Sequence, residues 1–447
     1  MKEAKKLPSY SVITFGCQMN EYDSEVLAGV LEGLGLVPAE TPERAEVIMI
    51  NTCCVRETAE NKVFSLLGRL RLLKQKRPEL LIGVSGCMSQ QEGMAARIRH
   101  GFPHVDLIVG TGDACRLPEL LGNALAERRV QVSVNRSPGG VVENLPVKRV
   151  AGVRAWVPIM YGCDNFCTYC IVPYVRGRER SRLPADILRE LRNLSDSGFK
   201  EVVLLGQNVN SYGKDLPAPM DFAGLLKEIE TEAAGLSRVR YMTSHPRDFS
   251  PGLVETIASL SKVCEHFHLP VQAGSNRILQ EMRRGYTREE YLRLAELIRT
   301  RLPEATITTD IMVGFPGETE ADFQDTLNLV KEVEFDSAYT FIYNPRAGTP
   351  AADMPGQIPE AEKKRRIQEL LAGQNQISLA RNQKEVNRVQ EVLAEGASKS
   401  GTGLLAGRNR GNKTVVFPGG AALAGQTVKV RITQAHLAGL EGELCDG

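Results

Sequence analysis

The sequence lacks any apolar stretch that approaches the length of a membrane-spanning helix. Its first ten residues are basic, and no apolar segment of the secretory type follows them. The formal net charge is only +1 over 447 residues, so the chain as a whole shows no strong bias towards polyanions. These absences predict a cytoplasmic protein that does not enter membranes and that meets any nucleic acid through local basic patches.

A disulfide framework is not expected either. The chain has 10 cysteines but is far longer than the small secreted domains that disulfides stabilise. In a cytosolic chain, cysteines point to metal binding. Hydrophobic residues make up 42% and charged residues 24% of the sequence, which is ordinary for a soluble globular protein. The length predicts two to four domains.

Three cysteines lie in one short segment, Cys163-Asp-Asn-Phe-Cys167-Thr-Tyr-Cys170, which reads CxxxCxxC. A [4Fe–4S] cluster normally takes four cysteines, so three thiolates leave one iron open. An open coordination position is typical of catalytic rather than structural metal sites. A zinc knuckle would favour CxxC pairs separated by a longer stretch, and a disulfide loop would suit a short secreted chain. The segment therefore predicts a catalytic iron–sulfur cluster.

The first part of the chain alternates short apolar runs with helical patterns. Strands are expected at 11–15, 47–50, 81–84 and 105–109, and helices at 22–33 and 58–76. This alternation predicts a parallel sheet with helices on its faces.

Cysteines follow three of these strands. Cys17, Cys53 and Cys87 each come within three residues of a predicted strand end. The carboxyl ends of parallel strands share one edge of the sheet, where ligands bind, so these thiols are expected to converge. They predict a second cluster with an open iron, against the alternative of three unrelated buried thiols. The spacing leaves open whether Cys53 or Cys54 is the ligand.

After a linker over residues 126–150, with a possible strand at 130–134, the strand–helix alternation resumes. Short connecting loops and six successive units predict an open, partial barrel whose chemistry lies at the carboxyl ends of the strands. The CxxxCxxC segment follows the first of these strands. The strands are expected at 155–161, 201–206, 238–243, 267–271, 306–313 and 337–343, with helices such as 187–197 and 291–301 between them.

Polar residues at these strand ends are candidates for cofactor binding. Gly206 allows close backbone approach, and the amides of Gln207 and Asn208 can read a polar ligand, although an ordinary strand–helix turn has the same composition. Gln272 ends the fourth strand and faces the same predicted cavity. Asp310, within the fifth strand, needs a partner if it is buried, and either a ligand or a nearby arginine can supply one.

Arginines follow the cysteine segment at every second position: Arg176, Arg178, Arg180 and Arg182. In an extended segment all four would point to one side. Their place beside the predicted cluster favours a clamp on phosphate or on a cofactor carboxylate over a solvated edge strand.

The C-terminal region differs in character from the rest of the chain. After a basic helix at 361–376, short strands broken by glycine are expected at 391–394, 402–407, 413–417 and 427–433. This pattern predicts a small antiparallel barrel of a kind that often binds RNA. Residues 396–433 contain no acid, which favours phosphate contact over a merely solvated surface. The basic residues in this span are Lys399, Arg408, Arg410, Lys413, Lys429 and Arg431.

Taken together, these motifs resemble the radical S-adenosylmethionine methylthiotransferase family over nearly the whole chain. Phe-Gly-Cys17-Gln-Met-Asn-Glu-Tyr-Asp-Ser, Asn-Thr-Cys53-Cys-Val-Arg-Glu and Ser-Gly-Cys87 resemble its N-terminal domain. The Cys163 segment, with Tyr169 before its last cysteine and Ile-Val-Pro-Tyr-Val-Arg-Gly after it, resembles the radical core. The tail resembles a TRAM domain. The first motif is most similar to the MiaB group, which makes 2-methylthio-N(6)-isopentenyladenosine in tRNA.

The resemblance implies the site and its cofactors. The ligands would be Cys17, Cys53 (rather than Cys54) and Cys87 for one [4Fe–4S] cluster, and Cys163, Cys167 and Cys170 for the other. The catalytic cysteines would be the second set, with Tyr169, Gly206, Gln207 and Asn208 at the S-adenosyl-L-methionine. Gln272 and Asp310, from their places on the strands, are the further candidates for contact with this cofactor. The fold implied is α/β: a parallel α/β domain (8–125), a linker (126–148), a partial (β/α)6 barrel (149–380) and a TRAM barrel (382–445).

The implied reaction inserts a methylthio group at carbon 2 of N(6)-isopentenyladenosine at position 37 of tRNA. One cluster would reduce the cofactor to a 5′-deoxyadenosyl radical, and the other would carry the sulfur, which a second cofactor molecule methylates. The anticodon-loop base would be splayed out to reach the cavity. The partners implied are the tRNA anticodon loop and a small electron-donor protein, with the enzyme a monomer.

Two alternatives stay open from the sequence. A methylthiotransferase of the same family can act on threonylcarbamoyladenosine in tRNA or on a ribosomal-protein aspartate. An RNA-binding iron–sulfur sensor without turnover would use the same cysteines and the same basic barrel.

Overall fold

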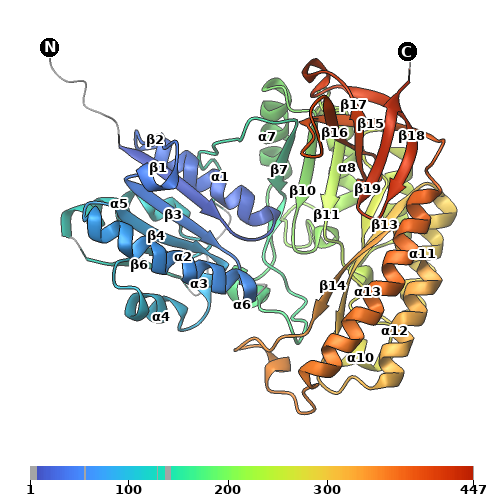
Figure 1. Ribbon diagram of the computed structural model, residues 1–447, viewed down its shortest axis with the longest axis horizontal. Helices are drawn as coiled ribbons and strands as arrows, with labels where there is room; N and C mark the ends of the chain where they lie inside the picture. The colour runs from blue at the N-terminus through green and yellow to red at the C-terminus, as the bar shows by residue number, and fades with distance from the viewer. Residues whose placement is uncertain (1–7, 55–56, 128, 136–141, 446–447) are drawn as a thin grey trace. The chain divides into compact units, whose positions relative to one another are not determined.

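The computed structural model describes residues 8–54, 57–127, 129–135 and 142–445 (Figure 1). Its internal contacts divide the chain into two compact units, which are taken separately below. Unit 1 comprises Met1–Ala151, Met160–Asp164 and Cys170–Arg180, and unit 2 comprises Gly152–Ile159, Asn165–Tyr169 and Ser181–Gly447. The described part of the chain contains no helix long and apolar enough to cross a membrane.

Unit 1 is built on one six-stranded parallel sheet, which confirms the predicted alternation. The strand order is β2-β1-β3-β4-β5-β6, and every pairing between neighbours is parallel. The short edge strand β2 was not anticipated, whereas β6 confirms the strand expected inside the linker. The strands are β1 (Ser9–Thr14), β2 (Val37–Pro38), β3 (Val47–Thr52), β4 (Leu81–Gly86), β5 (Leu107–Val109) and β6 (Gln131–Ser133).

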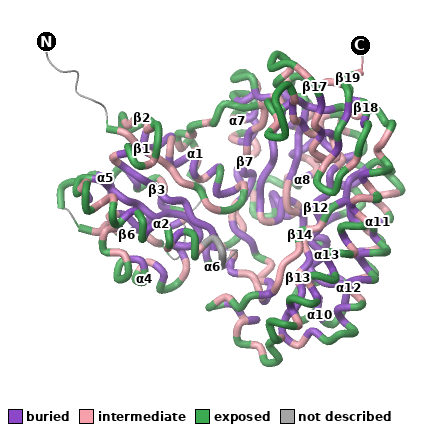
Figure 2. Tube along the Cα trace, viewed as in Figure 1, coloured by how far each residue is buried: buried purple, intermediate pink, exposed green. Residues whose placement is uncertain are grey.

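Helices connect these strands and bury the sheet. All residues of β3 and β4 are buried, as Figure 2 shows for the centre of unit 1, because helices cover both faces of a parallel sheet. Burying each aliphatic side chain there contributes about 1.5–3 kcal/mol. The helices are α1 (Gln18–Gly33), α2 (Glu57–Lys76), α3 (Cys87–Gln90), α4 (Met94–Gly101), α5 (Leu117–Glu127) and α6 (Val172–Arg176).

Unit 2 contains the predicted open barrel as two three-stranded parallel sheets, ordered β7-β10-β11 and β12-β13-β14. A single bridge from Val239 to Val263 links β11 to the segment that leads into β12. Each of the six strands corresponds to a predicted one. They are β7 (Arg154–Pro158), β10 (Glu201–Leu205), β11 (Arg238–Met242), β12 (His266–His268), β13 (Thr306–Val313) and β14 (Ser337–Ile342).

Amphipathic helices pack outside these strands. Two of them begin with capping boxes, at Thr287 and Thr319, which fix where α11 and α12 start. The helices are α7 (Pro184–Asp196), α8 (Phe222–Glu232), α9 (Pro251–Ser259), α10 (Asn276–Glu281), α11 (Arg288–Arg301), α12 (Glu320–Val333) and α13 (Glu360–Gln383).

The C-terminal region closes into a five-stranded barrel, in the order β15-β16-β17-β19-β18. Four strands were predicted, but β19 was not, because its sequence Gly-Leu-Glu-Gly-Glu-Leu has no β-branched residue. The strands are β15 (Val389–Ala397), β16 (Leu404–Asn409), β17 (Thr414–Pro418), β18 (Thr427–His436) and β19 (Gly439–Leu444).

Two buried arginines of β11 attach this small barrel to the rest of unit 2. Arg238 donates to the carbonyl oxygens of Arg408 (2.6 Å) and Glu391 (3.0 Å). Arg240 donates to the carbonyl oxygens of Arg410 (2.7 Å) and Asn409 (2.6 Å). Buried guanidinium groups are costly unless they are hydrogen-bonded, so these four bonds to backbone carbonyl oxygens favour one docking geometry.

The expected one-sided row of arginines after the cysteine segment is wrong. Pro173 lies in the first turn of α6, and Gly177, at φ +75°, ends that helix, so the segment is not extended. Arg176 is consequently buried, whereas Arg178 is exposed and pairs with Asp164 at 2.6 Å.

Candidate functional site

The three predicted ligands of unit 1 all lie where a strand of the parallel sheet ends. Cys17 is the N-cap of α1 after β1, Cys53 directly follows β3, and Cys87 begins α3 after β4. A Cβ placed on Gly16 would lie 2.8 Å from the Cβ of Cys53. Glycine at this position, with φ +140°, therefore lets the segments that carry Cys17 and Cys53 approach closely.

A buried pair of asparagines holds these two segments in place. Asn20 donates to Asn51 Oδ1 (3.1 Å) and to the carbonyl oxygen of Thr52 (3.0 Å), and Asn51 donates back to the carbonyl oxygen of Asn20 (2.8 Å). Both side chains are fully buried. Neither was singled out in the sequence, although each lies within three residues of a predicted ligand. Their bonds fix the start of α1 against the end of β3.

Two groups around Cys87, Cys54 and Arg176, favour its thiolate. Arg176 Nε lies 3.2 Å from Cys87 Sγ, and the same guanidinium pairs with Asp23 at 2.7 Å. A hydrogen bond from Cys54, together with the charge of Arg176, lowers the pKa of Cys87 to about 7. Donating that bond raises the pKa of Cys54 well above its ordinary value. The structure thus brings Cys54, as well as the predicted Cys17, towards Cys87.

Hydrogen bonds anchor the CxxxCxxC segment within each unit. In unit 1, Cys163 N donates to the carbonyl oxygen of Gly177 (3.1 Å), and a Cβ on Gly162 would lie only 2.0 Å from the carbonyl oxygen of Arg178. In unit 2, Thr168 donates through Oγ1 to the carbonyl oxygen of Glu281 (2.9 Å). Cys163 and Cys167 are buried, and Cys170 is half-buried.

The donor set fits iron–sulfur clusters. All ten cysteines, each within the described residues, are free thiols. In the part of the chain that the structure describes, no three His, Cys, Asp or Glu side chains gather around the position of a single ion. A cubane differs from a single ion, because each ligating thiolate binds a separate iron. One cysteine of each predicted set also accepts an N–H from a buried arginine: Cys87 from Arg176 and Cys167 from Arg284.

Of the predicted cofactor residues of unit 2, Asn208 and Gln272 follow strands and Asp310 lies within β13, and their side chains differ in availability. Asn208 is buried, and its amide is occupied: Nδ2 donates to Asp248 (2.8 Å) and Oδ1 accepts from His245 N (3.1 Å). Gln272, at φ +72°, donates its backbone N–H to the carbonyl oxygen of Asp310 (2.8 Å). The carboxylate of Asp310 lies 3.5 Å from His268 Nε2, so its neighbour is a histidine rather than an arginine.

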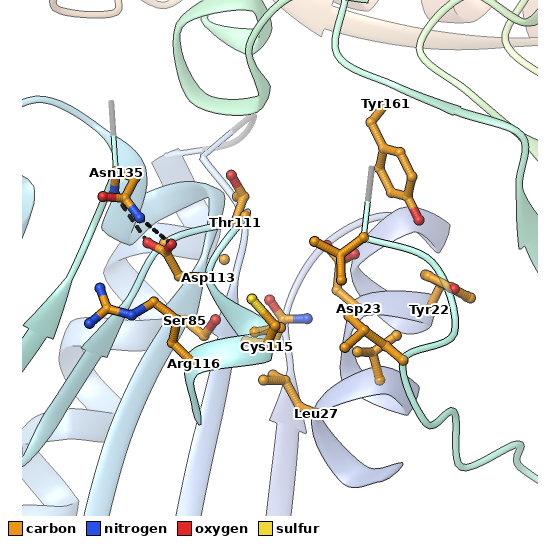
Figure 3. A pocket seen from close by; sticks show the side chains of 18 of the residues that line it. Tyr22, Asp23, Leu27, Ser85, Thr111, Asp113, Cys115, Arg116, Asn135 and Tyr161 are labelled. Carbon is orange, nitrogen blue, oxygen red and sulfur yellow. Dashed lines mark hydrogen bonds between the residues drawn. The ribbon is translucent and has the colours of Figure 1, made fainter. Parts of the chain in front are cut away.

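Unit 1 also contains a cavity of about 370 Å³, shown in Figure 3. Ser85 and Gly86, which precede Cys87, line it, as do the loop after β5 and the first half of α1. Asp113 accepts from Asn135 N (3.1 Å) and orders one side. The lining combines aromatic, aliphatic and polar groups: Tyr22, Val26, Leu27, Leu145, Tyr161, Asn51 and Thr111 are among them.

Three of the six basic residues predicted to face RNA make contacts within unit 2 instead. Arg410 forms a bidentate pair with Glu265 (2.6 and 2.8 Å), and Lys413 lies 3.1 Å from Asp336. Arg408 donates to the carbonyl oxygen of Asn412 (3.0 Å). The three exposed candidates are Lys399, Lys429 and Arg431.

Comparisons with known proteins match this architecture segment by segment. The Radical SAM superfamily model matches residues 157–330, the TRAM domain model matches 383–445, and a model described as Uncharacterized protein family UPF0004 matches 9–110. A solved radical S-adenosylmethionine methyltransferase, TsrM from Kitasatospora setae with cobalamin and a [4Fe–4S] cluster, shares the fold. It covers 78% of this chain and 77% of its own, at a TM-score of 0.55 and 15% identity.

The fold and the matched models define a radical S-adenosylmethionine protein with a TRAM domain. Curated relatives of nearly equal length identify its family. The tRNA-2-methylthio-N(6)-dimethylallyladenosine synthase of Pelotomaculum thermopropionicum is 62% identical over 98% of both chains. That of Moorella thermoacetica is 55% identical over the whole of both. The chain belongs to this family, and the resemblance predicted from its motifs is confirmed.

Proposed function

We propose that this protein is a tRNA methylthiotransferase that converts N(6)-isopentenyladenosine at position 37 to its 2-methylthio derivative. The main support is the similarity to synthases of that name, at 62% and 55% identity over nearly the full length of the chain. The six cysteines of the two predicted sets add to it. When bound, S-adenosylmethionine and the two clusters supply a radical able to take hydrogen from carbon 2 of adenine and the sulfur that replaces it.

The residues of unit 2 would bind and orient the cofactor. Cys163, Cys167 and Cys170 would hold the radical-generating cluster, with one iron left for the cofactor. Gln272 follows β12 and Asp310 lies within β13, and the hydrogen bond from Gln272 N to the Asp310 carbonyl oxygen holds them side by side, which supports both as cofactor contacts. Because the Asn208 amide is already bonded to Asp248 and His245, we assign it to shaping the turn after β10.

The residues of unit 1 would hold the sulfur-carrying cluster through Cys17, Cys53 and Cys87. The cavity beside Gly86 offers room for the modified adenine. Tyr22 and Tyr161 can stack on the base, while Val26, Leu27 and Leu145 suit the apolar isopentenyl group. Enclosure there would exclude water from a reactive radical.

RNA would be held by the C-terminal barrel through the exposed Lys399, Lys429 and Arg431. Because Arg408, Arg410 and Lys413 already make internal bonds, their contribution is to position the barrel. The partner class is tRNA, and the electron donor is proposed to be a small redox protein. We further propose that the protein works in the cytoplasm as a monomer.

The test is mass spectrometry of tRNA nucleosides from a strain that lacks this gene. Loss of 2-methylthio-N(6)-isopentenyladenosine, with its unmodified precursor accumulating, is the expected result. Persistence of the 2-methylthio nucleoside would refute the substrate. Loss of the threonylcarbamoyl counterpart instead would favour the alternative methylthiotransferase, and RNA binding without cofactor cleavage would favour a sensor.

A further inference from the structure

Two buried arginines have no role in the reaction described above, yet each one donates to a cysteine sulfur. Arg284 is 4% exposed and places Nη1 3.3 Å from Cys167 Sγ. Arg176 is 6% exposed and places Nε 3.2 Å from Cys87 Sγ. The two cysteines belong to different predicted clusters, so the same device occurs twice.

Arg284 is held rigidly within unit 2. Its Nη2 donates to the carbonyl oxygen of Pro270 (2.8 Å), and its Nε donates to Tyr286 Oη (3.1 Å). Among the described residues, no carboxylate lies within ion-pair distance of this guanidinium. A buried positive charge is costly unless it is paired, and the negative group that its geometry offers is the Cys167 sulfur.

Arg176 differs in one respect, because it also pairs with a carboxylate. Its Nη2 lies 2.7 Å from Asp23, a residue of α1. The guanidinium is therefore largely neutralised, while its Nε–H still points at Cys87. The two sites thus offer nearly the same hydrogen bond with different net charge.

We propose that Arg284 and Arg176 are positioning residues that raise the reduction potentials of the two clusters by donating an N–H to one ligand sulfur of each. The inference rests on the proposed function, since it requires both clusters. Reduction adds one negative charge to a cluster, and hydrogen bonds to its sulfurs stabilise that charge. The uncompensated Arg284 shifts its cluster more than the Asp23-paired Arg176 shifts the other.

The expected effect is a shift of the midpoint potential. Charge-assisted hydrogen bonds are stronger than neutral ones, and only part of their free energy distinguishes the reduced from the oxidised cluster. Arg284→Gln is expected to lower the reduced-to-oxidised ratio of its cluster about tenfold at fixed potential, which is ~59 mV for one electron. Arg176→Gln is expected to lower the ratio of the other cluster by a smaller factor.

The experiment is a potentiometric titration of the anaerobically reconstituted full chain, followed by electron paramagnetic resonance. Cys163→Ala and Cys87→Ala samples assign each signal to its cluster. Arg283→Gln and Arg178→Gln serve as matched controls, because these exposed arginines neighbour Arg284 and Arg176 and receive the same substitution. Each control is expected to leave both midpoints unchanged.

The outcomes separate this inference from the proposed function. A wild-type chain that binds no iron would contradict the clusters themselves. Fully loaded Arg284→Gln protein with an unchanged midpoint, or with both clusters shifted equally, would overturn the inference. If Arg284→Gln fails to fold, Arg284→Lys is the second variant, because it keeps the positive charge but lacks the planar guanidinium and its N–H donors. Its midpoint potential is expected to lie below that of the wild type. An unchanged midpoint in that variant would also overturn the inference.

Discussion

Cys53 and Cys54 are adjacent at the end of β3, yet they have different neighbours. Consecutive side chains of an extended segment point to opposite faces, so only one of them can face a given cluster. Cys53 lies against Gly16, beside Cys17, while Cys54 packs with Cys87, Ile171 and Val175. The proposed ligand is Cys53, with Cys54 in a supporting contact to Cys87.

Replacing each of these cysteines in turn distinguishes the two roles. Cys53→Ala is expected to lose one cluster, so the iron content of reconstituted protein falls from about eight to about four per chain. Cys54→Ala removes a buried thiol but no ligand, so it is expected to keep about eight irons. Iron analysis measures both, and full iron in Cys53→Ala beside half in Cys54→Ala would reverse the assignment.

His266 is expected to make the stability of unit 2 depend on pH. It is 4% exposed, and burial lowers its pKa to about 3. Between this value and an ordinary histidine pKa of about 6.5, the unfolded chain binds a proton that the folded chain does not. The free energy of unfolding is therefore unaffected by His266 above about pH 6.5 and decreases as the pH falls below it. At pH 5 the decrease from this residue is roughly 2 kcal/mol.

Denaturant unfolding at pH 7 and pH 5 measures this effect. His266→Gln replaces the imidazole with a neutral amide that can still bond to Thr308, which lies 3.0 Å from His266 Nε2. The variant is expected to lose less stability than the wild type on acidification. An equal loss in the two proteins would show that other groups dominate the pH dependence.

Residue patterns predicted which cysteines matter but not what surrounds them. The ligand sets followed from spacing and from strand ends, which are local features. The contacts of Arg176 with Cys87 and of Arg284 with Cys167 join residues 89 and 117 positions apart. Such pairs are created by tertiary packing, and no periodicity in a single sequence records them.

At the scale of elements, β18 carries the clearest basic face of the C-terminal barrel. Lys429 and Arg431 are two residues apart on this strand, so both side chains project from the same face. Both are exposed, whereas Arg410 and Lys413 on the β16–β17 turn are bound to Glu265 and Asp336. The acid-free span of sequence thus divides into an outer part, which we propose faces RNA, and an inner part that contacts the rest of unit 2.

Lys429→Ala combined with Arg431→Ala is expected to weaken tRNA binding and to reduce the salt dependence of the binding constant by about two released counterions. Cofactor cleavage should be unaffected. Exposed Lys227 and Lys331, on α8 and α12, supply the matched double-alanine control. Filter binding across salt concentrations measures both effects. If the salt dependence of tRNA binding is unaltered in the β18 variant, the RNA-binding surface does not include Lys429 and Arg431.

The segment after residue 141 forms one wall of the unit 1 cavity through Val142 and Leu145. Leu145→Trp would fill space proposed for the isopentenyl group. Methylthio transfer is expected to fall at least about tenfold, the cost of roughly 1.4 kcal/mol in binding, while iron content stays unchanged. Nucleoside mass spectrometry measures transfer. Val150→Trp, at a position 71% exposed, is the control. Equal activity of the two variants would contradict the proposal that the substrate binds in this cavity.

Element types were largely predictable, because short stretches of sequence determine the hydrophobic alternation and the order of strands and helices. The parallel sheet of unit 1 and the six barrel strands agree with expectation, and so does the C-terminal barrel, except that β17 and β19 pair in parallel rather than antiparallel. The failures have local causes. Pro173 and Gly177 convert an expected extended segment into α6 and a turn, and β19 lacks the β-branched residues that mark a strand.

At the scale of the whole molecule, one chain combines three functions that the reaction requires. The cluster at its N-terminal cysteines would carry sulfur, and the cluster at the CxxxCxxC segment would generate the radical. The five-stranded C-terminal barrel would hold RNA. Relatives of the same family align over nearly their full lengths, so the complete combination is retained here. The central claim is that all three act on the same adenine.

The most direct test uses the purified, anaerobically reconstituted protein with a tRNA that carries N(6)-isopentenyladenosine, S-adenosylmethionine and a chemical reductant. Mass spectrometry of the digested tRNA is expected to show the 2-methylthio nucleoside, with 5′-deoxyadenosine formed alongside it. Cys163→Ala protein should give neither product, and Cys87→Ala protein should give 5′-deoxyadenosine without methylthio transfer. Cofactor cleavage by the wild type with the tRNA left unmodified would contradict the account.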